Sequence, residues 1–404
     1  MTPRRLRVLI DARMLMGRFS GVSRVVTRLV DELTKSDDIR ITAMCGATPY
    51  APWLDRPDID MLVTDFTRAD RTVGRRLLWE EMTLPKVIRS ARVDLFHATW
   101  NSGIPFRCPV PAVLTIHDLI PWESPKDHFA TFASRTLYRY GVRSSARRAA
   151  VVTTVSDYTR SRVLDRLGVP PNRVITVPNG VDLPPERFDQ GEGVKQTSQH
   201  AETKPYVLYV GGHERRKNVA AVFNAMRCYW KRFDPALELR LTGQASSLDP
   251  EARAAFLAVP ENAPVRFLDA PSDDELAGAY RGATALLLLS RQEGFGLPVL
   301  EAMAHGCPVI AARRTSLPEV VGEGGILVNP DQPSEIAEQL HGLVTPPSCR
   351  SALIAAGRRH AARFAWSLCA QRMRRAYDLA TAPDKHAAAD PASADTHHSG
   401  LSPA

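Results

Sequence analysis

The fold of this chain is decided by residues 286–304, which read LLLLSRQEGFGLPVLEAMA. The four leucines form an apolar run short enough for a buried strand, and a helical pattern begins near Pro298, a residue that suits the first turn of a helix. The glycines at 294 and 296 let the intervening loop approach a ligand closely. Ligands of open α/β sheets bind at the carboxyl ends of strands, so this unit predicts a doubly wound α/β sheet with a site at the loop.

The same strand–helix alternation runs through the rest of the chain in two blocks. Apolar strand candidates separated by helical or loop-like sequence are typical of parallel sheets. At 404 residues the chain is also too long for one ordinary core. The strand candidates lie at 6–11, 39–44, 95–98, 112–116, 151–155 and 173–177, and then at 206–210, 237–241, 265–268, 285–289, 308–311 and 325–328.

Composition sets the expected boundaries. A Rossmann-like domain is predicted over 1–183, and a linker rich in Pro, Glu, Gln, Gly and Ser over 184–204. A second Rossmann-like domain covers 205–362, followed by a helix at 363–382. Residues 383–404, rich in Ala, Asp, His, Ser and Pro, are expected to be disordered.

Bulk properties exclude several classes of protein. The apolar share of 44% and the charged share of 24% are those of a globular chain. The sequence has no run of about 18 uncharged apolar residues, so no membrane span is predicted. Six scattered cysteines, none paired at two-residue spacing, favour a reducing cytoplasm over a disulfide framework or a zinc site. The net charge of +8 favours anionic partners, although no recognised nucleic-acid-binding module is present.

Two carboxylates frame the loop of the deciding stretch. Glu293 follows the leucine strand, and Glu301 lies about one turn into the helix. Their spacing can aim both side chains into one cleft. Taken alone, the pattern also fits a surface helix residue at Glu301 and an acid at Glu293 that the helix dipole favours in a first turn.

A second loop suits an anion. Residues 211–218, GGHERRKN, come directly after the first strand of the second block. Glycines, cations and the N-terminus of a helix are a combination that binds diphosphates. The alternative is a solvated basic turn.

Residues 285–340 closely resemble the retaining GT-B glycosyltransferases of the large family that includes lipopolysaccharide and O-antigen mannosyltransferases. The resemblance rests on EGFGLPVLEAMAHGCPVIA at 293–311 and SLPEV at 316–320, and weaker matches extend over nearly the whole ordered chain. It implies two facing Rossmann-like domains and a C-terminal helix that crosses back onto the first. It also implies a donor bound mainly by the second domain and an acceptor bound mainly by the first.

The resemblance also assigns roles to residues. Glu293 would lie by the donor sugar and Glu301 would bond the ribose, while Arg216 and Lys217 would grip the diphosphate. Many relatives carry an arginine where this chain has Gly212, so the choice between Arg215 and Arg216 stays open. The remaining donor-binding residues implied are Gly211, Gly212, Gly294, Phe295, Gly296, Leu297 and, in a Ser20-Gly21 loop before the first helix, Gly21.

A histidine completes the predicted site. His117-Asp118 follows a strand candidate, and a lone histidine there is usually a satisfied core or surface group. In the resembling family a histidine at this point faces the donor sugar, and we expect Asp118 to fix its tautomer. His97, at the end of another strand candidate, has a weaker claim.

The resemblance implies a metal-independent enzyme without cofactor that moves a hexose from a GDP- or UDP-linked donor with retention of configuration. The acceptor would be a glycan or a polyprenyl-diphosphate-linked molecule in surface polysaccharide synthesis. Residues 78–85, LWEEMTLP, resemble relatives that use mannose. Two alternatives stay open: a nucleotide-sugar epimerase of the same architecture, and a binding protein that has lost activity.

Two further patterns remain. Arg135, Arg139, Arg143 and Arg147 recur at four-residue spacing with Arg148 beside them, which predicts a basic helix stripe. The stripe is either a solvated face or a docking site, for anionic lipid headgroups at the inner face of the cytoplasmic membrane or for a lipid-diphosphate acceptor. Asp58-Ile59-Asp60 matches the Asp-x-Asp signature of metal-dependent glycosyltransferases, but we expect it to lie in a Pro-rich loop and to be coincidental.

Overall fold

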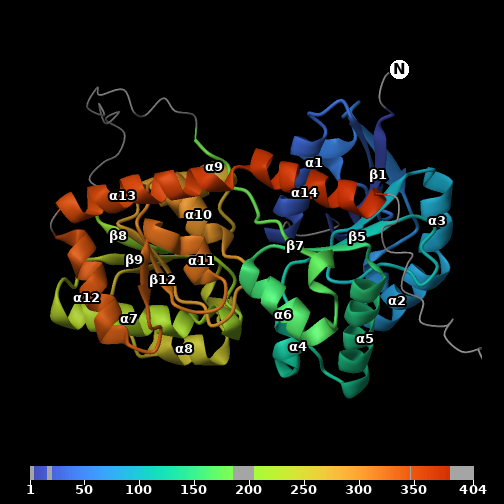
Figure 1. Cartoon of the computed structure of the whole chain (residues 1–404). Coiled ribbons are helices and arrows are strands. Elements are labelled where there is room, and N and C mark those ends of the chain that lie inside the picture. The colour runs from blue at the N-terminus through green and yellow to red at the C-terminus, as the bar shows by residue number, and fades with distance from the viewer. Residues whose placement is uncertain (1–3, 16–20, 185–203, 346, 383–404) are drawn as a thin grey trace, which may run out of the picture.

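The computed structural model describes residues 4–15, 21–184, 204–345 and 347–382. Most of the predicted linker, all of the predicted tail at 383–404, and Ser20 of the Ser20-Gly21 loop lie outside the described residues. The two parallel sheets lie in two halves of the chain, side by side (Figure 1).

The first half is built on a parallel sheet of seven strands in the order β3-β2-β1-β4-β5-β6-β7. The strand order reverses between β1 and β4, and ligands of such sheets bind in the crevice at this point. The strands are β1 (Leu6–Asp11), β2 (Ile39–Cys45), β3 (Ile59–Val63), β4 (Leu95–Ala98), β5 (Ala112–Ile116), β6 (Val151–Thr154) and β7 (Val174–Thr176).

Strand β3 is absent from the strand candidates, and the expectation of a loop at 58–60 is wrong for Ile59 and Asp60. Both residues pair with β2 at the edge of the sheet. The Asp60 carboxylate bonds Arg40 on β2 at 2.6 Å, and Asp58 pairs with Arg56. Each acid of the Asp-x-Asp pattern is therefore neutralised by an arginine at the sheet edge.

The second half repeats the design with six parallel strands in the order β10-β9-β8-β11-β12-β13. The order reverses between β8 and β11, which places a second crevice at their carboxyl ends. The strands are β8 (Tyr206–Tyr209), β9 (Glu238–Thr242), β10 (Val265–Leu268), β11 (Ala285–Leu288), β12 (Val309–Ala312) and β13 (Ile326–Val328).

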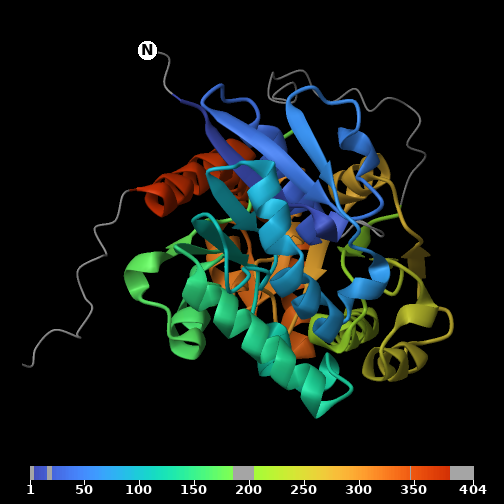
Figure 2. The same ribbon diagram turned by 90° about the vertical axis from the view of Figure 1, so that its right-hand side faces the viewer.

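Helices cover both faces of each sheet, as Figures 1 and 2 show. The alternation along β1 explains why: Val8 and Ile10 pack into one apolar cluster and Leu9 packs into another, so both faces of the strand are buried. The helices of the first half are α1 (Gly21–Leu33), α2 (Val73–Met82), α3 (Leu84–Ala91), α4 (Ile120–Glu123), α5 (Phe132–Arg148) and α6 (Asp157–Leu167). Those that follow are α7 (Val219–Arg232), α8 (Pro250–Leu257), α9 (Asp273–Gly282), α10 (Leu297–Ala304), α11 (Leu317–Val321), α12 (Pro333–Val344), α13 (Pro347–Ala361) and α14 (Trp366–Thr381). Among the residues that the structure describes, no helix is long and apolar enough to span a bilayer.

Helix α14 crosses from the second half onto the first, as the family resemblance implies (Figure 1). It packs against α1 and the strands β4 to β6, and Met373 and Tyr377 belong to the apolar cluster of the first half. The crossing begins where Val181 N donates to the Phe364 carbonyl oxygen at 2.7 Å. A side chain on Gly180 would collide with Trp366, so the chain requires glycine where the helix begins.

A buried hydrogen-bonded chain fixes α14 to the first sheet. The Tyr377 hydroxyl bonds His97 Nδ1 at 2.8 Å, and His97 Nε2 bonds Thr115 Oγ1 at 2.8 Å. Burial lowers the pKa of His97 to about 3, so the imidazole is neutral. Both ring nitrogens of His97 are therefore hydrogen-bonded in the core, and His97 is not a candidate for the site.

We predict that Tyr377→Phe lowers the free energy of unfolding by about 1–3 kcal/mol, because a buried imidazole nitrogen loses its partner. Chemical denaturation checks this value. Tyr140→Phe is the matched control, since the Tyr140 side chain is exposed on α5, and its stability should equal that of the wild type. Equal stability of both variants would contradict the structural role of the His97–Tyr377 bond.

Candidate active site

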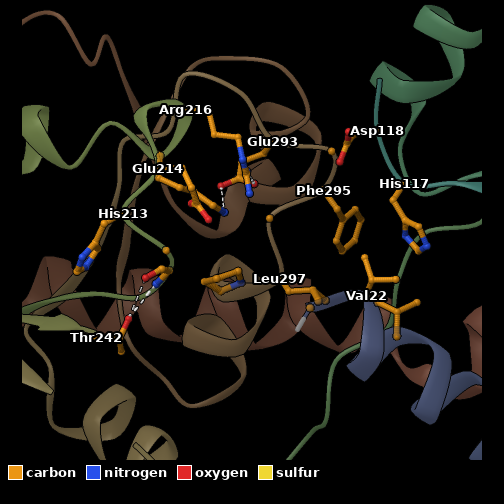
Figure 3. Close-up of a pocket in the computed structure, with 18 of the residues that line it drawn as sticks. Val22, His117, Asp118, His213, Glu214, Arg216, Thr242, Glu293, Phe295 and Leu297 are labelled. Atoms are coloured by element: carbon orange, nitrogen blue, oxygen red, sulfur yellow. Dashed lines mark hydrogen bonds and ion pairs between the residues drawn. The ribbon is translucent and has the colours of Figure 1, made fainter. Parts of the chain in front are cut away.

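A cavity of about 920 Å³ opens between the two halves, where the carboxyl ends of both sheets meet (Figure 3). His117 and Val22 of the first half lie across it from His213 and Thr242 of the second. All of the predicted site residues except Glu301 line this cavity. They are Gly21, His117, Gly211, Gly212, Arg216, Lys217, Glu293, Gly294, Phe295, Gly296 and Leu297.

Glu301 lies elsewhere, and the expectation that both glutamates point into one cleft is wrong. Glu301 lines a smaller cavity of about 170 Å³, and Leu297 borders both cavities. The reason is the helical repeat: Glu301 lies one turn beyond Leu297 on the same face of α10, so Leu297 stands between it and the larger cavity.

Glu293 is buried against two cations. Its Oε1 lies 2.7 Å from Lys217 Nζ and accepts a 2.8 Å hydrogen bond from Ser290 Oγ, and its Oε2 lies 3.5 Å from Arg216 Nη1. Burial alone would raise the pKa of the Glu293 carboxyl, but Lys217 and Arg216 outweigh it and the net shift is downward. The carboxylate is therefore ionised at neutral pH, and the cluster of Glu293 with Lys217 and Arg216 keeps an excess of positive charge.

Two hydrogen bonds to backbone carbonyl oxygens tie the cationic loop to the glutamate loop. Asn218 adopts a left-handed conformation with φ of 55° and donates from Nδ2 to the Leu289 carbonyl oxygen at 2.9 Å. Arg291 N donates to the Arg216 carbonyl oxygen at 2.8 Å. Arg215 points away and pairs with Glu251 at 3.7 Å. Arg216 rather than Arg215 thus lines the cavity.

The glycine-rich loop owes its shape to two constraints. Gly296 has a φ of 113°, which favours glycine, and a side chain on Gly294 would collide with the His117 carbonyl oxygen of the first half. Ser316 Oγ bonds the carbonyl oxygens of Glu293 and Phe295 at 3.0 and 2.9 Å. The second matching string, at 316–320, therefore holds the first one in place.

Helix α10 begins at the cavity wall. Gly296 precedes it without a side-chain cap, and Leu297 and Pro298 line the cavity. Pro298 has no N–H and Val299 N donates to the Gly296 carbonyl oxygen at 3.0 Å, so the first turn offers an anion mainly the positive end of the helix dipole. With Arg216 and Lys217 nearby, this wall suits a diphosphate.

His117 is held by a backbone carbonyl rather than by Asp118. Its Nε2 lies 2.9 Å from the Thr99 carbonyl oxygen and so carries the proton, whereas Asp118 Oδ1 accepts from Ile120 N. The expectation that Asp118 fixes the tautomer is therefore wrong. Burial lowers the pKa of His117, so the ring is neutral and its Nδ1 is an acceptor.

Glu301 is bonded by residues that sequence reasoning missed. Its Oε1 lies 2.7 Å from Arg24 Nη1, and its Oε2 accepts from the Tyr280 hydroxyl at 2.9 Å. Arg24 also pairs with Asp273 at 2.6 Å. No local pattern marks Arg24 or Tyr280, because both contacts arise only from packing. Thr242 and Gly243, which also line the cavity, could have been found from their place after a strand candidate.

Further contacts hold the two halves together beside the cavity. Ser156 Oγ donates to the Gly294 carbonyl oxygen at 2.7 Å. The Glu319 carboxylate accepts from Asp157 N and Tyr158 N at 2.8 and 3.0 Å, at the N-terminus of α6. An acid is favoured at this end of a helix, so Glu319 joins the halves with charge and hydrogen bonds together.

Comparison with known proteins gives consistent matches. Residues 204–345 match the family model described as glycosyl transferases group 1, and residues 19–184 match that of glycosyltransferase family 4. The chain is 30% identical to O-antigen chain mannosyltransferase B of Escherichia coli over 297 residues, which are 72% of this chain and 76% of that protein. It is 34% identical to D-inositol 3-phosphate glycosyltransferase of Frankia alni over 238 residues, and this match spans 57% of that relative and 55% of this chain. The structure resembles that of HepE from Anabaena in complex with UDP and glucose, with a TM-score of 0.67, 19% identity, and coverage of 92% of this chain and 99% of that one.

We predict that the Arg24–Glu301 ion pair couples the two halves. A double-mutant cycle with Arg24→Ala and Glu301→Ala should give a coupling energy of about 1 kcal/mol in denaturation experiments, because both side chains are largely buried. The exposed Arg28–Asp182 pair, which also lines the smaller cavity beside Glu301, is the control, and its coupling energy should be close to zero. Equal coupling in the two cycles would argue against a contact that holds the halves together.

Proposed function

Because the chain belongs to the group 1 glycosyltransferases and has a GT-B fold, we propose that it transfers a hexose, with mannose favoured, from a GDP- or UDP-linked donor with retention of configuration. The proposed acceptor is a glycan or a polyprenyl-diphosphate-linked molecule. The observation that carries this proposal is the Lys217–Glu293–Arg216 cluster beside the N-terminus of α10, at the wall of the cavity between the halves.

The donor diphosphate would lie against this wall. A cation 4 Å from a phosphate oxygen contributes roughly 4 kcal/mol at an effective dielectric constant near 20, before desolvation is subtracted. Arg216, Lys217 and the positive end of the α10 dipole would together supply the positive charge that a metal ion supplies in a metal-dependent enzyme. We therefore expect a chelator to leave the activity unchanged. The UDP bound in the HepE structure supports a nucleotide-linked donor.

The reaction needs charge stabilisation more than a protein nucleophile. The bond between the anomeric carbon and the diphosphate oxygen breaks, and a bond from the acceptor hydroxyl oxygen forms on the same face. The acceptor proton passes to the leaving phosphate oxygen. Arg216 and Lys217 offset the charge that develops on the leaving group, and their positions are fixed before reaction, which is how preorganised sites accelerate such steps. Glu293 and neutral His117 would orient the sugar.

The sugar and the acceptor are inferred from the relatives. Mannose is favoured by the similarity to O-antigen chain mannosyltransferase B, while the second relative is named for a different acceptor. A thermal-shift screen of GDP-, UDP-, ADP- and TDP-linked sugars tests the donor. GDP-mannose should give the largest shift, and NMR of the product should show the anomeric configuration of the donor. An inverted product would refute the retaining mechanism.

We predict that Lys217→Ala lowers turnover about 100-fold or more at saturating donor, because the leaving diphosphate loses one of the positive charges that stabilise it. Lys231→Ala, at an exposed position on α7, is the matched control and should turn over like the wild type. Circular dichroism should show both variants folded. Near-normal turnover of Lys217→Ala would contradict the role of Lys217.

We also predict that Glu301→Gln weakens the affinity for the nucleoside diphosphate about tenfold, because the ribose hydroxyls lose a charged acceptor. This role requires the ribose to lie beside Leu297, where the two cavities adjoin. Asp273→Asn removes the other acidic partner of Arg24 and should leave the affinity within about twofold. Calorimetry measures both values, and equal losses in the two variants would assign the effect to Arg24 instead of the ribose.

A further inference from the structure

The Asn101 side chain joins the two loops that leave β4 and β5 at the carboxyl edge of the first sheet. Its Oδ1 accepts a hydrogen bond from His117 N at 2.9 Å, and its Nδ2 donates to the Asp118 carbonyl oxygen at 2.9 Å. A backbone N–H only donates and a carbonyl oxygen only accepts, so these partners fix the orientation of the amide. Asn101 therefore clamps the His117–Asp118 backbone at two points.

The clamp extends the sheet beyond the last residues that pair. Strands β4 and β5 are parallel, and their paired register ends with Ala98 opposite Leu114. A side-chain amide offers the same donor and acceptor as a peptide group, so Asn101 supplies two further bonds between the loops. Asn101 is only 7% exposed, and either group would be left buried without a partner if the clamp were lost. The positions of the two loops are therefore coupled.

The segment that contains Asn101 also holds the His117 ring. The Thr99 carbonyl oxygen binds His117 Nε2 at 2.9 Å, and Thr99 Oγ1 donates to the Asp11 carbonyl oxygen at the end of β1. Residues 99–101 thus fix both the ring and the main chain of His117. Figure 3 shows this ring on the first-half side of the cavity.

The glutamate loop packs on the same clamped backbone. A side chain on Gly294 would collide with the His117 carbonyl oxygen and with Asp118 Cβ, so this loop lies directly against both residues. A shift of the His117–Asp118 backbone would therefore move the ring and also the contact surface of the loop beside Glu293. Asn101 does not line the cavity, so it can act on a substrate only through these neighbours.

We propose that Asn101 is a positioning residue for the transfer reaction, which holds His117 and the backbone on which the glutamate loop packs. The proposal rests on the proposed function, in which neutral His117 orients the donor sugar. Misplacing a group by about 1 Å can lower the rate on the order of 100-fold, so a clamp that fixes geometry before reaction matters for turnover. Nucleotide binding would depend instead on the second half, where Arg216 and Lys217 lie.

Steady-state kinetics with the full chain test the proposal. Asn101→Ala should lower kcat about tenfold or more and leave the calorimetric affinity for GDP or UDP within about twofold. Asn101→Asp keeps the size of the side chain, but its carboxylate cannot donate to the Asp118 carbonyl oxygen, so kcat should fall here too. Ser145→Ala is the matched control. Buried Ser145 Oγ accepts from Gly103 N and Ile104 N at 3.1 and 3.2 Å in the same loop, so this variant should unfold more easily but keep its kcat.

The tautomer of His117 gives a readout that needs no turnover. NMR of protein labelled at the histidine ring nitrogens, with His117→Gln to assign the signal, should show the wild-type proton on Nε2. Asn101→Ala should let the other tautomer appear, and Ser145→Ala should not. Failure of the wild type to transfer any sugar would refute the proposed function, and the spectra would still show whether Asn101 holds His117. Unchanged kcat and spectra in both Asn101 variants would overturn the proposal, as would equal losses of kcat in Asn101→Ala and Ser145→Ala.

Discussion

The candidate site depends on one buried ion pair, between the Glu293 carboxylate and the Lys217 ammonium. A carboxylate buried in a protein is tolerated only when charge and hydrogen bonds compensate it, and here Lys217, Arg216 and Ser290 do so. The pairing draws the loop after β8 against the loop after β11. The hydrogen bonds from Asn218 Nδ2 to the Leu289 carbonyl oxygen and from Arg291 N to the Arg216 carbonyl oxygen fix that arrangement. As a result, two cations and the start of α10 face the same space.

The same loops are also where the two halves meet. Gly294 lies so close to the His117 carbonyl that only glycine fits, and Ser156 and Glu319 bond across the junction. Helix α14 leads the chain back from the second half to the first, where the Tyr377–His97 hydrogen bond holds it. The cavity is therefore a property of the assembled pair of halves. A change far from its walls, at Gly180 or Tyr377, can alter its shape by altering how the halves dock.

Sequence patterns predicted the parts of this arrangement that rest on local rules. The leucine run before Glu293 and the glycines after it locate a strand, a loop and a helix, and the carboxyl-end rule brings those loops together. Strand β3 was not predicted, because it is an edge strand in which Asp60 interrupts the apolar pattern. The separation of Glu301 from Glu293 was not predicted, because only the geometry of the folded helix places Leu297 between Glu301 and the larger cavity. Asp118 was expected beside the His117 ring, but its carboxylate bonds the following backbone, a common alternative for Asp at a turn.

Glu301 shows how the donor and the junction between the halves can act on each other. Its carboxylate offers about four acceptor positions, and Arg24 and Tyr280 occupy two of them. Under the proposed role, ribose hydroxyls can use the remaining positions without displacing Arg24. Because Arg24 comes from the first half, a ligand that favours the carboxylate orientation set by Arg24 binds the closed pair of halves better than separated ones. By linkage, contact between the halves then strengthens donor binding by the same factor. Under the proposed role, the second glutamate would therefore join recognition of the nucleotide to closure of the cavity in which the reaction is proposed to occur.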